Sequence, residues 1–294
     1  MSASPTLARL GFSARDRVLV IHADDVGMCD ATVEAFRDLT AFGLVTCGSV
    51  MTPCRGFPGA AALARENPSL DVGVHLTLTS EWDAYRWPPL STRDPASGLI
   101  DPDGYLPKET QTVSRRAIPE CAFHEMMTQV NFAKAAGICP THIDAHMYAA
   151  MEPQLFPQYL RVSEESGLPA FVSRDGPQNW PGRSTTVRAW EERGFPVFDH
   201  RLSFRWQGDP DDYLPRAKAL IDSVEPGLTC LLIHPAYKSP ELMSIVPPWR
   251  YYVRDYQAFL SAELRTHVRD SGIILLGYRH MKFPPLSSAS YSRA

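Results

Sequence analysis

Short apolar runs alternate with helical patterns along most of the chain. Residues 17–23 (RVLVIHA) form a β-branched apolar run that predicts a buried strand. Asp30 then suits a helix N-cap, apolar residues follow at helical spacing, and Gly43 suits the helix end. The same alternation predicts further strands at 44–51, 71–79, 141–147, 169–173, 196–204, 228–236 and 272–278. Further helices are predicted at 59–65, 119–137, 153–167, 185–194, 211–225 and 251–271.

This alternation favours an α/β fold in which parallel strands are joined by helices. About eight strands predict a TIM-like (β/α) barrel of seven to eight parallel strands, irregular or incompletely closed. We expect a single catalytic barrel domain over residues 1–283. The Pro- and Gly-containing segment 80–114 is predicted to be a long loop that serves as a lid, and the Ser-rich tail 284–294 to be disordered.

Composition narrows the class of protein. Apolar residues make up 44% and charged residues 21% of the chain, as in globular proteins with a sizeable core. The net charge of −4 and the lack of a basic stripe argue against nucleic acid or a membrane surface as a partner. No signal peptide or membrane-length apolar run is evident, and the six cysteines form no CxxC pair, so we expect a cytoplasmic protein with reduced thiols. A homo-oligomer is compatible with the sequence.

The segment 141–146 (THIDAH) carries metal-binding chemistry. In a strand, His142, Asp144 and His146 share one face because side chains alternate with a period of two. Two imidazoles and a carboxylate turned toward a core need partners, since burying them unpaired is costly.

Other ionisable residues fall at the ends of predicted strands, where barrel active sites lie. The simplest interpretation is one divalent metal ion bound by Asp25, His75 and His146, with Zn²⁺ favoured by the nitrogen donors and Mg²⁺ plausible. Asp24 would then accept a proton from water, and His234 would donate one to a leaving group. Asp144, one pleat deeper than His146, would orient a ligand or His234, and His142 would be structural.

Several residues support weaker hypotheses. The loop aromatics Trp82, Tyr85, Trp87 and Tyr105 either stack on sugar rings or pin the loop, and Arg174 and Arg254 either contact substrate or form surface ion pairs. His124 and Glu125 begin like a zinc-protease HExxH helix, but Thr128 stands at the second ligand position, which predicts a solvated helix face. His22 and His200 receive no assigned role.

Four motifs in order resemble the YdjC-like carbohydrate deacetylases: 23–27 (ADDVG), 73–79 (GVHLTLT), 141–146 (THIDAH) and 234–236 (HPA). The resemblance covers about residues 17–278, and the family is similar to the polysaccharide deacetylases. It implies a (β/α) barrel that removes N-acetyl groups from small amino-sugar saccharides. It further implies that Asp24 is the general base, that His234 is the general acid and that Asp25, His75 and His146 are the metal ligands.

Metal-dependent deacetylation of a small N-acetylated saccharide is therefore the leading hypothesis. One alternative is a non-haem iron oxygenase with a His142, Asp144 and His234 triad, although such triads usually occur in all-β folds. Another is a saccharide-binding barrel without catalysis, against which the presence of both Asp24 and His234 argues.

Overall fold

The computed structural model describes residues 3–176, 180–204 and 212–281. The described strands are β1 (Arg17–Val26), β2 (Cys47–Val50), β3 (Val72–Leu76), β4 (Ile143–Ala145), β5 (His200–Ser203), β6 (Gly227–Ile233) and β7 (Ile274–Leu275). The described α-helices are α1 (Pro5–Arg9), α2 (Asp30–Phe42), α3 (Phe57–Glu66), α4 (Thr110–Arg116), α5 (Pro119–Ala135), α6 (Phe156–Ser166), α7 (Arg183–Glu192), α8 (Tyr213–Asp222), α9 (Pro240–Ile245), α10 (Trp249–Phe259) and α11 (Ala262–Asp270). Short 3₁₀ turns occur at η1 (Pro95–Ser97), η2 (His146–Met151) and η4 (Tyr278–His280).

Strand β1 is the centre of one parallel sheet with the order β4-β3-β2-β1-β6-β5. On one side β6 pairs with β1 from Arg17 to Ala23. On the other side β7 pairs with the beginning of β1 and β2 with its end. Every ladder is parallel, so the carboxyl ends of the strands meet at one mouth. The predicted α/β fold with an incompletely closed barrel is confirmed.

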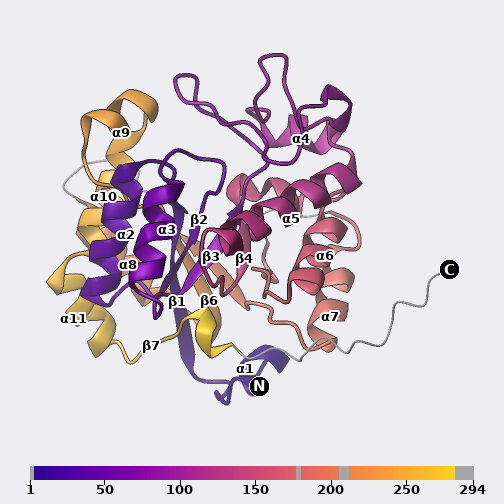
Figure 1. The fold of residues 1–294 in the computed structure, drawn as a ribbon. Coiled ribbons are helices and arrows are strands. Elements are labelled where there is room, and N and C mark those ends of the chain that lie inside the picture. The colour runs from indigo at the N-terminus through magenta and orange to yellow at the C-terminus, as the bar shows by residue number, and fades with distance from the viewer. Residues whose placement is uncertain (1–2, 177–179, 205–211, 282–294) are drawn as a thin grey trace.

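Helices cover the sheet on both sides. In Figure 1, α2, α3, α10 and α11 lie on one side of the strands and α5, α6 and α7 on the other, with α4 and the long loop beyond the mouth. Residues 18–26 of β1 are all buried, as expected for a central parallel strand covered by helices. The polar residues near the end of this strand are therefore held in a rigid, mostly dry frame.

The predicted strand at 169–173 is wrong, and the described residues contain seven strands rather than eight. This segment crosses the gap between β4 and β5 through two single bridges, Ile143 to Ala170 and Ser173 to Phe198. Side chains take up its carbonyl groups: the Tyr159 hydroxyl donates to the Phe171 oxygen at 3.1 Å and Arg183 donates to the Ser173 oxygen at 2.7 Å. Its backbone still bonds Ile143 on one side and Phe198 on the other, but side chains take the Phe171 and Ser173 carbonyls, so the pairing does not extend into a regular ladder.

The predicted helix at 251–271 is also wrong, because it is two helices. Helix α10 ends at Phe259 and α11 begins at Ala262. Between them Ser261 has an extended backbone, and its side chain accepts a hydrogen bond from the Leu264 N–H. A serine that caps a new helix in this way favours a break over continuation.

The segment 80–114 is anchored to α5 by Glu125. This residue is fully buried, and its carboxylate accepts hydrogen bonds from the backbone N–H groups of Leu90 at 3.0 Å and Ser91 at 2.7 Å. The predicted solvated face is therefore wrong for Glu125, whereas its neighbour His124 is exposed. The segment also contains η1 and the start of α4, so it has more structure than a plain loop.

The remaining expectations concern the chain as a whole. In the described part of the chain, no helix combines the length and the apolar character needed to cross a bilayer. All six cysteines are free thiols, and four of them are buried. The tail 284–294 lies outside the described residues, and the single domain over 1–283 stays a prediction.

Candidate metal centre and active site

Two consecutive aspartates at the end of β1 both reach the mouth of the barrel. Regular alternation would place Asp24 and Asp25 on opposite faces of the strand. The register with β2 shifts between Ala23 and Val26, and Asp25 has a left-handed backbone with φ 61°. This irregularity turns the Asp25 side chain toward the same cavity as Asp24. Backbone strain at such a position is typical of functional sites.

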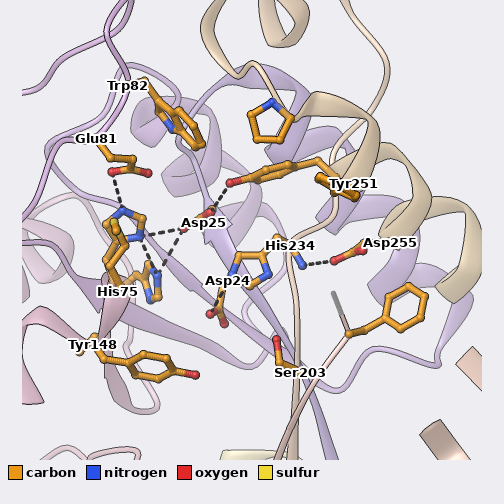
Figure 2. A pocket seen from close by; sticks show the side chains of 16 residues that line it. Asp24, Asp25, His75, Glu81, Trp82, Tyr148, Ser203, His234, Tyr251 and Asp255 are labelled. Atoms are coloured by element: carbon orange, nitrogen blue, oxygen red, sulfur yellow. Dashed lines mark hydrogen bonds and ion pairs between the residues drawn. The ribbon is translucent and has the colours of Figure 1, made fainter. Parts of the chain in front are cut away.

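Asp25 meets two histidines from neighbouring strands (Figure 2). Its Oδ1 lies 3.1 Å from His146 Nδ1 and 3.4 Å from His75 Nε2, and those two nitrogens are 3.3 Å apart. All three residues are buried, and the three donor atoms lie within 4.8 Å of one another. The structure thus brings together the three residues that the sequence predicts as metal ligands.

Each donor is held by a second contact that leaves one atom facing the centre. His75 Nδ1 lies 2.8 Å from Asp144 Oδ2, so Nε2 points inward. His146 Nε2 lies 3.0 Å from Glu81 Oε2, so Nδ1 points inward, and the Tyr252 hydroxyl donates to Asp25 Oδ2 at 3.3 Å. Imidazole ligands of metal ions are commonly oriented by carboxylates in this manner. The donor set therefore fits a divalent cation with two nitrogen ligands and one oxygen ligand.

The charges of this set compensate one another. Burial alone would raise the pKa of Asp25, but the charge of His146 and hydrogen bonds from both histidines leave it well below its usual value. Burial alone would lower the pKa of His146, but the carboxylates of Glu81 and Asp25 raise it to about 9. Burial would also lower the pKa of His75, but the negative charge of Asp144 outweighs burial and leaves this pKa well above its usual value. The imidazoles therefore bind protons strongly where a metal ion would bind.

A cavity of about 360 Å³ opens directly over these donors. Asp24 and His234 both line it, and Asp24 Oδ2 lies 3.5 Å from His234 Nε2. His234 follows β6, and its backbone N–H donates to Asp255 Oδ2 at 2.6 Å. The aromatic residues of the cavity wall are Trp82, Tyr148, Phe204, Tyr251 and Tyr252. Asp24 and His234, the three donor residues and the aromatic side chains therefore share one cavity.

A family model described as YdjC-like protein matches residues 18–270 of this chain. The chain belongs to the YdjC-like family. This confirms the resemblance inferred from the four motifs.

Relatives of this YdjC-like chain are named as deacetylases. A carbohydrate deacetylase of Thermus thermophilus is 34% identical over 88% of this chain and 92% of its own length. A chitooligosaccharide deacetylase of Yersinia enterocolitica is 31% identical over 61% of this chain and 70% of its own length. The crystal structure of an Enterococcus faecalis protein, named as a candidate cellobiose-phosphate cleavage protein, aligns with a TM-score of 0.75. It covers 90% of this chain and 98% of its own, and at 21% identity it shows the shared fold.

Of the six predicted substrate contacts of the YdjC-like chain, one lies in the cavity wall and five lie elsewhere. Trp82 lines the cavity. The other five do not belong to its described lining, which is clearest for Tyr85 and Trp87, since both are buried inside the loop. The Tyr85 hydroxyl donates to the Met28 oxygen and the Trp87 indole N–H to the Thr79 oxygen.

The remaining three make contacts elsewhere. Arg86 lies over the Tyr105 ring at 5.3 Å from its centroid. Arg174 pairs with Glu191 and Asp199, and Arg254 donates to Gln257. These contacts are those of loop packing and surface pairing.

Several residues of this YdjC-like site were not predicted from the sequence. Glu81 and Tyr252 contact the donor set, yet neither belongs to a motif, and Tyr252 comes from a helix far along the chain. His22 was assigned no role, although its Nδ1 lies 2.7 Å from Asp24 Oδ1; its period-two spacing from Asp24 was the available signal. His200 is outside the described cavity lining, and its Nε2 lies 3.3 Å from the Pro226 oxygen.

The alternative iron triad is not assembled. Among the described residues, the donor groups that come together do not combine His142, Asp144 and His234. Asp144 instead bonds His75, while His142 lies deeper, fully buried beside His22.

Proposed function

We propose that this chain is a metal-dependent deacetylase that hydrolyses the N-acetyl amide of a small amino-sugar saccharide to acetate and a free amine. The observation that carries the proposal is the single cavity that places Asp24 and His234 beside the Asp25, His75 and His146 donor set. The names of the Thermus and Yersinia relatives support the substrate class.

Asp25, His75 and His146 would hold one divalent cation. Two imidazole nitrogens favour Zn²⁺ over Mg²⁺, which prefers oxygen ligands. When bound, the cation would polarise the acetyl carbonyl and lower the pKa of a water molecule.

Two side chains of the protein would carry the protons. Asp24 Oδ2 takes a proton from the attacking water, and His234 Nε2 gives a proton to the departing amine nitrogen. The two atoms are 3.5 Å apart, so the proton held by Asp24 can return to His234 before the next turnover. One water is consumed: its oxygen ends in acetate, one of its protons passes from Asp24 to His234, and the other ends on the released amine, which is an ammonium group at neutral pH.

The aromatic wall would receive the saccharide. Trp82 and Tyr251 both line the cavity, and Figure 2 shows the Trp82 side chain above Asp25. Aromatic faces offer apolar area to sugar rings while their polar tips remain hydrogen-bonded or hydrated.

The test is acetate release from N-acetylated glucosamine oligomers by purified protein. Chelation should abolish release, and added Zn²⁺ should restore it. Asp24→Asn should lower kcat roughly 10²–10⁴-fold, the usual contribution of a general base, while metal content stays unchanged. His200→Gln is the control, because His200 lies outside the described cavity lining, and its rate should match wild type. Acetate release that survives complete metal removal would contradict the proposal.

A further inference from the structure

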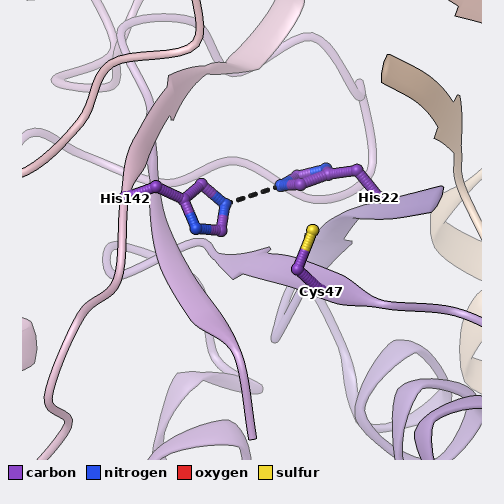
Figure 3. Close-up of side chains that lie close together, drawn as sticks. All are labelled: His22, Cys47 and His142. Carbon is purple, nitrogen blue, oxygen red and sulfur yellow. Dashed lines mark hydrogen bonds between the residues drawn. The ribbon is translucent and has the colours of Figure 1, made fainter. Parts of the chain in front are cut away.

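Two histidines meet inside the barrel below the cavity. His22 on β1 and His142, just before β4, are both fully enclosed, and their Nε2 atoms lie 2.8 Å apart. Figure 3 shows the two rings facing one another with Cys47 of β2 beside them. The Tyr278 ring stacks on His142 with centroids 3.8 Å apart. The mechanism proposed above uses neither ring.

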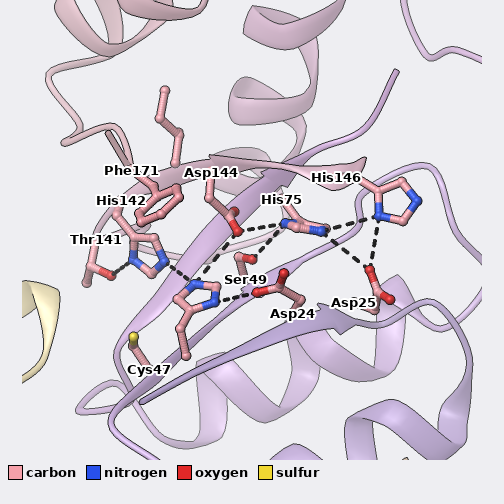
Figure 4. A network of polar contacts seen from close by, with 12 residues as sticks. Asp24, Asp25, Cys47, Ser49, His75, Thr141, His142, Asp144, His146 and Phe171 are labelled. Carbon is pink, nitrogen blue, oxygen red and sulfur yellow. Dashed lines mark hydrogen bonds and ion pairs between the residues drawn. The ribbon is translucent and has the colours of Figure 1, made fainter. Parts of the chain in front are cut away.

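The outer nitrogen of each ring has a partner that fixes its hydrogen (Figure 4). His22 Nδ1 lies 2.7 Å from Asp24 Oδ1, and an ionised carboxylate only accepts hydrogen bonds. His142 Nδ1 lies 2.9 Å from Thr141 Oγ1. The Thr141 hydroxyl donates its single hydrogen to the Asp71 carboxylate, so it must accept from His142. Both outer nitrogens therefore carry hydrogen.

The two Nε2 atoms then each present a lone pair, and these lone pairs face each other. A neutral imidazole has only one N–H group, and the outer position already holds it in both rings. Buried lone pairs 2.8 Å apart need a cation between them, which is either a proton or a metal ion bound also by Cys47.

The distance between the two Nε2 atoms favours the proton over the metal ion. Two zinc–nitrogen bonds of about 2.0–2.1 Å at a tetrahedral angle place the nitrogens about 3.3 Å apart. The nitrogens of His75 and His146 have this spacing, at 3.3 Å. The 2.8 Å between His22 and His142 is instead the length of a hydrogen bond.

We propose that His22 and His142 share one proton, so that the pair carries a fixed positive charge beneath Asp24. His22 is then a positioning residue: it holds Asp24 Oδ1 and leaves Oδ2 for the cavity and His234. This inference rests on the proposed role of Asp24 as the base.

The surroundings of the pair supply the compensating charge. Asp24 bonds His22 from β1, and Asp144 of β4 places Oδ2 3.9 Å from His22 Nε2. Burial would lower the pKa of His22, but the Asp144 charge and the Asp24 hydrogen bond outweigh it and leave the pKa raised. Burial and the charge of His22 lower the pKa of His142. Cys47 and Tyr278 also face the pair, and burial raises the pKa of each well above its usual value, which keeps both neutral.

The test is a count of ring hydrogens by NMR on zinc-loaded protein labelled with ¹⁵N-histidine. Three of the four ring nitrogens of the pair should be protonated, and one hydrogen should couple to nitrogens of both rings. His22→Asn should remove the shared hydrogen and leave His142 with hydrogen on Nδ1 alone. His267→Gln, at a surface position on α11, should leave the signals of the pair unchanged.

Two results would overturn the inference. One is a pair with only two ring hydrogens, which would mean that the outer nitrogen of one ring accepts a hydrogen bond instead of donating one. The other is a second bound metal ion together with loss of hydrogen from both Nε2 atoms. Both readouts are independent of turnover, so they can fail while acetate release is observed, and they can succeed while it is absent.

Kinetic measurements on two variants distinguish a positioning role of His22 from a role in packing alone. Asn at position 22 can still donate to Asp24, whereas Leu cannot. We expect kcat to fall at least about tenfold in His22→Leu relative to wild type, because a hydrogen bond to a charged group is lost. His22→Asn should recover part of that loss, with KM within about twofold of wild type in both variants. Equal kcat values for the two variants would contradict a positioning role.

Discussion

His146 uses both of its ring nitrogens in the proposed centre. Nδ1 faces Asp25 and His75, while Nε2 lies 3.0 Å from the Glu81 carboxylate. The same carboxylates that orient the ring also raise its pKa to about 9. A metal ion needs the Nδ1 lone pair, so metal and proton compete for this atom.

This competition predicts that Zn²⁺ expels protons when it binds the metal-free protein at pH 7. A raised pKa means that His146 keeps its proton below about pH 9, so zinc affinity should increase with pH up to that value. Calorimetry in buffers of different ionisation enthalpy counts the protons released. Glu81→Gln should lower the count, because it removes the main carboxylate that raises the His146 pKa, and Glu34→Gln on the exposed face of α2 should not. The same count for Glu81→Gln and wild type would contradict this.

The aspartates of β1 show what a motif can and cannot predict at the residue scale. Side-chain types and strand ends were enough to predict that Asp24, Asp25, His75, His146 and His234 converge, and the structure places all five around one cavity. The left-handed backbone at Asp25, which lets two consecutive residues face the same way, has no signal in a two-residue pattern. Glu81 and Tyr252 could not be predicted, because only the folded chain brings them to the donor set.

At the scale of elements, helix α5 carries a buried anchor for the loop that delivers Glu81 and Trp82. Glu125 accepts from Leu90 N, from Ser91 N and from the Ser91 hydroxyl, and Gln129 donates to it at 2.8 Å. One carboxylate that is excluded from water thus binds the loop to α5.

Glu125→Ala should destabilise the protein strongly. It removes the buried acceptor of the Leu90 and Ser91 backbone N–H groups, and lost hydrogen bonds to a charged group cost about 1.5–3 kcal/mol each, so we expect the free energy of unfolding to fall by about 3 kcal/mol. Denaturant unfolding measures the change, and hydrogen exchange should locate the loss of protection in 80–114. His124→Ala is the matched control, because its side chain is exposed one residue away. Equal stability of the two variants would show that the loop is held elsewhere.

Most elements followed from hydrophobic periodicity, and the exceptions have local causes. The strand predicted at 169–173 is reduced to two single bridges, because Tyr159 and Arg183 take two carbonyls that a longer ladder would use. The helix predicted at 251–271 fails because Ser261 caps a second helix. Both causes depend on side-chain hydrogen bonds, which a pattern of apolar positions does not encode.

At the scale of the whole molecule, the proposed ligands join strands that are far apart in sequence. Asp25 ends β1, His75 lies on β3, and His146 follows β4. A cation bound to all three would link the ends of these strands at the mouth of the barrel. Because a ligand that binds only the folded state stabilises that state by mass action, such a cation should stabilise the fold. Parallel topology and incomplete closure could be predicted from the alternation of elements, whereas the position of the irregular closure, between β4 and β5, could not.

Zn²⁺ should therefore raise the thermal midpoint of the chelated protein. At a free concentration one hundred times the Kd, the stabilisation is about 2.7 kcal/mol, which corresponds to a shift of about 4 °C for a chain of 294 residues. Asp25→Asn should lose the shift, and Asn tolerates the left-handed backbone that Asp25 adopts, so the variant should still fold. Asp24→Asn should keep the shift, because Asp24 is not among the proposed ligands. Calorimetric scans with and without zinc compare the three proteins. A shift of equal size in Asp25→Asn would place the metal ion elsewhere and leave the cavity without the cation that the proposed hydrolysis requires.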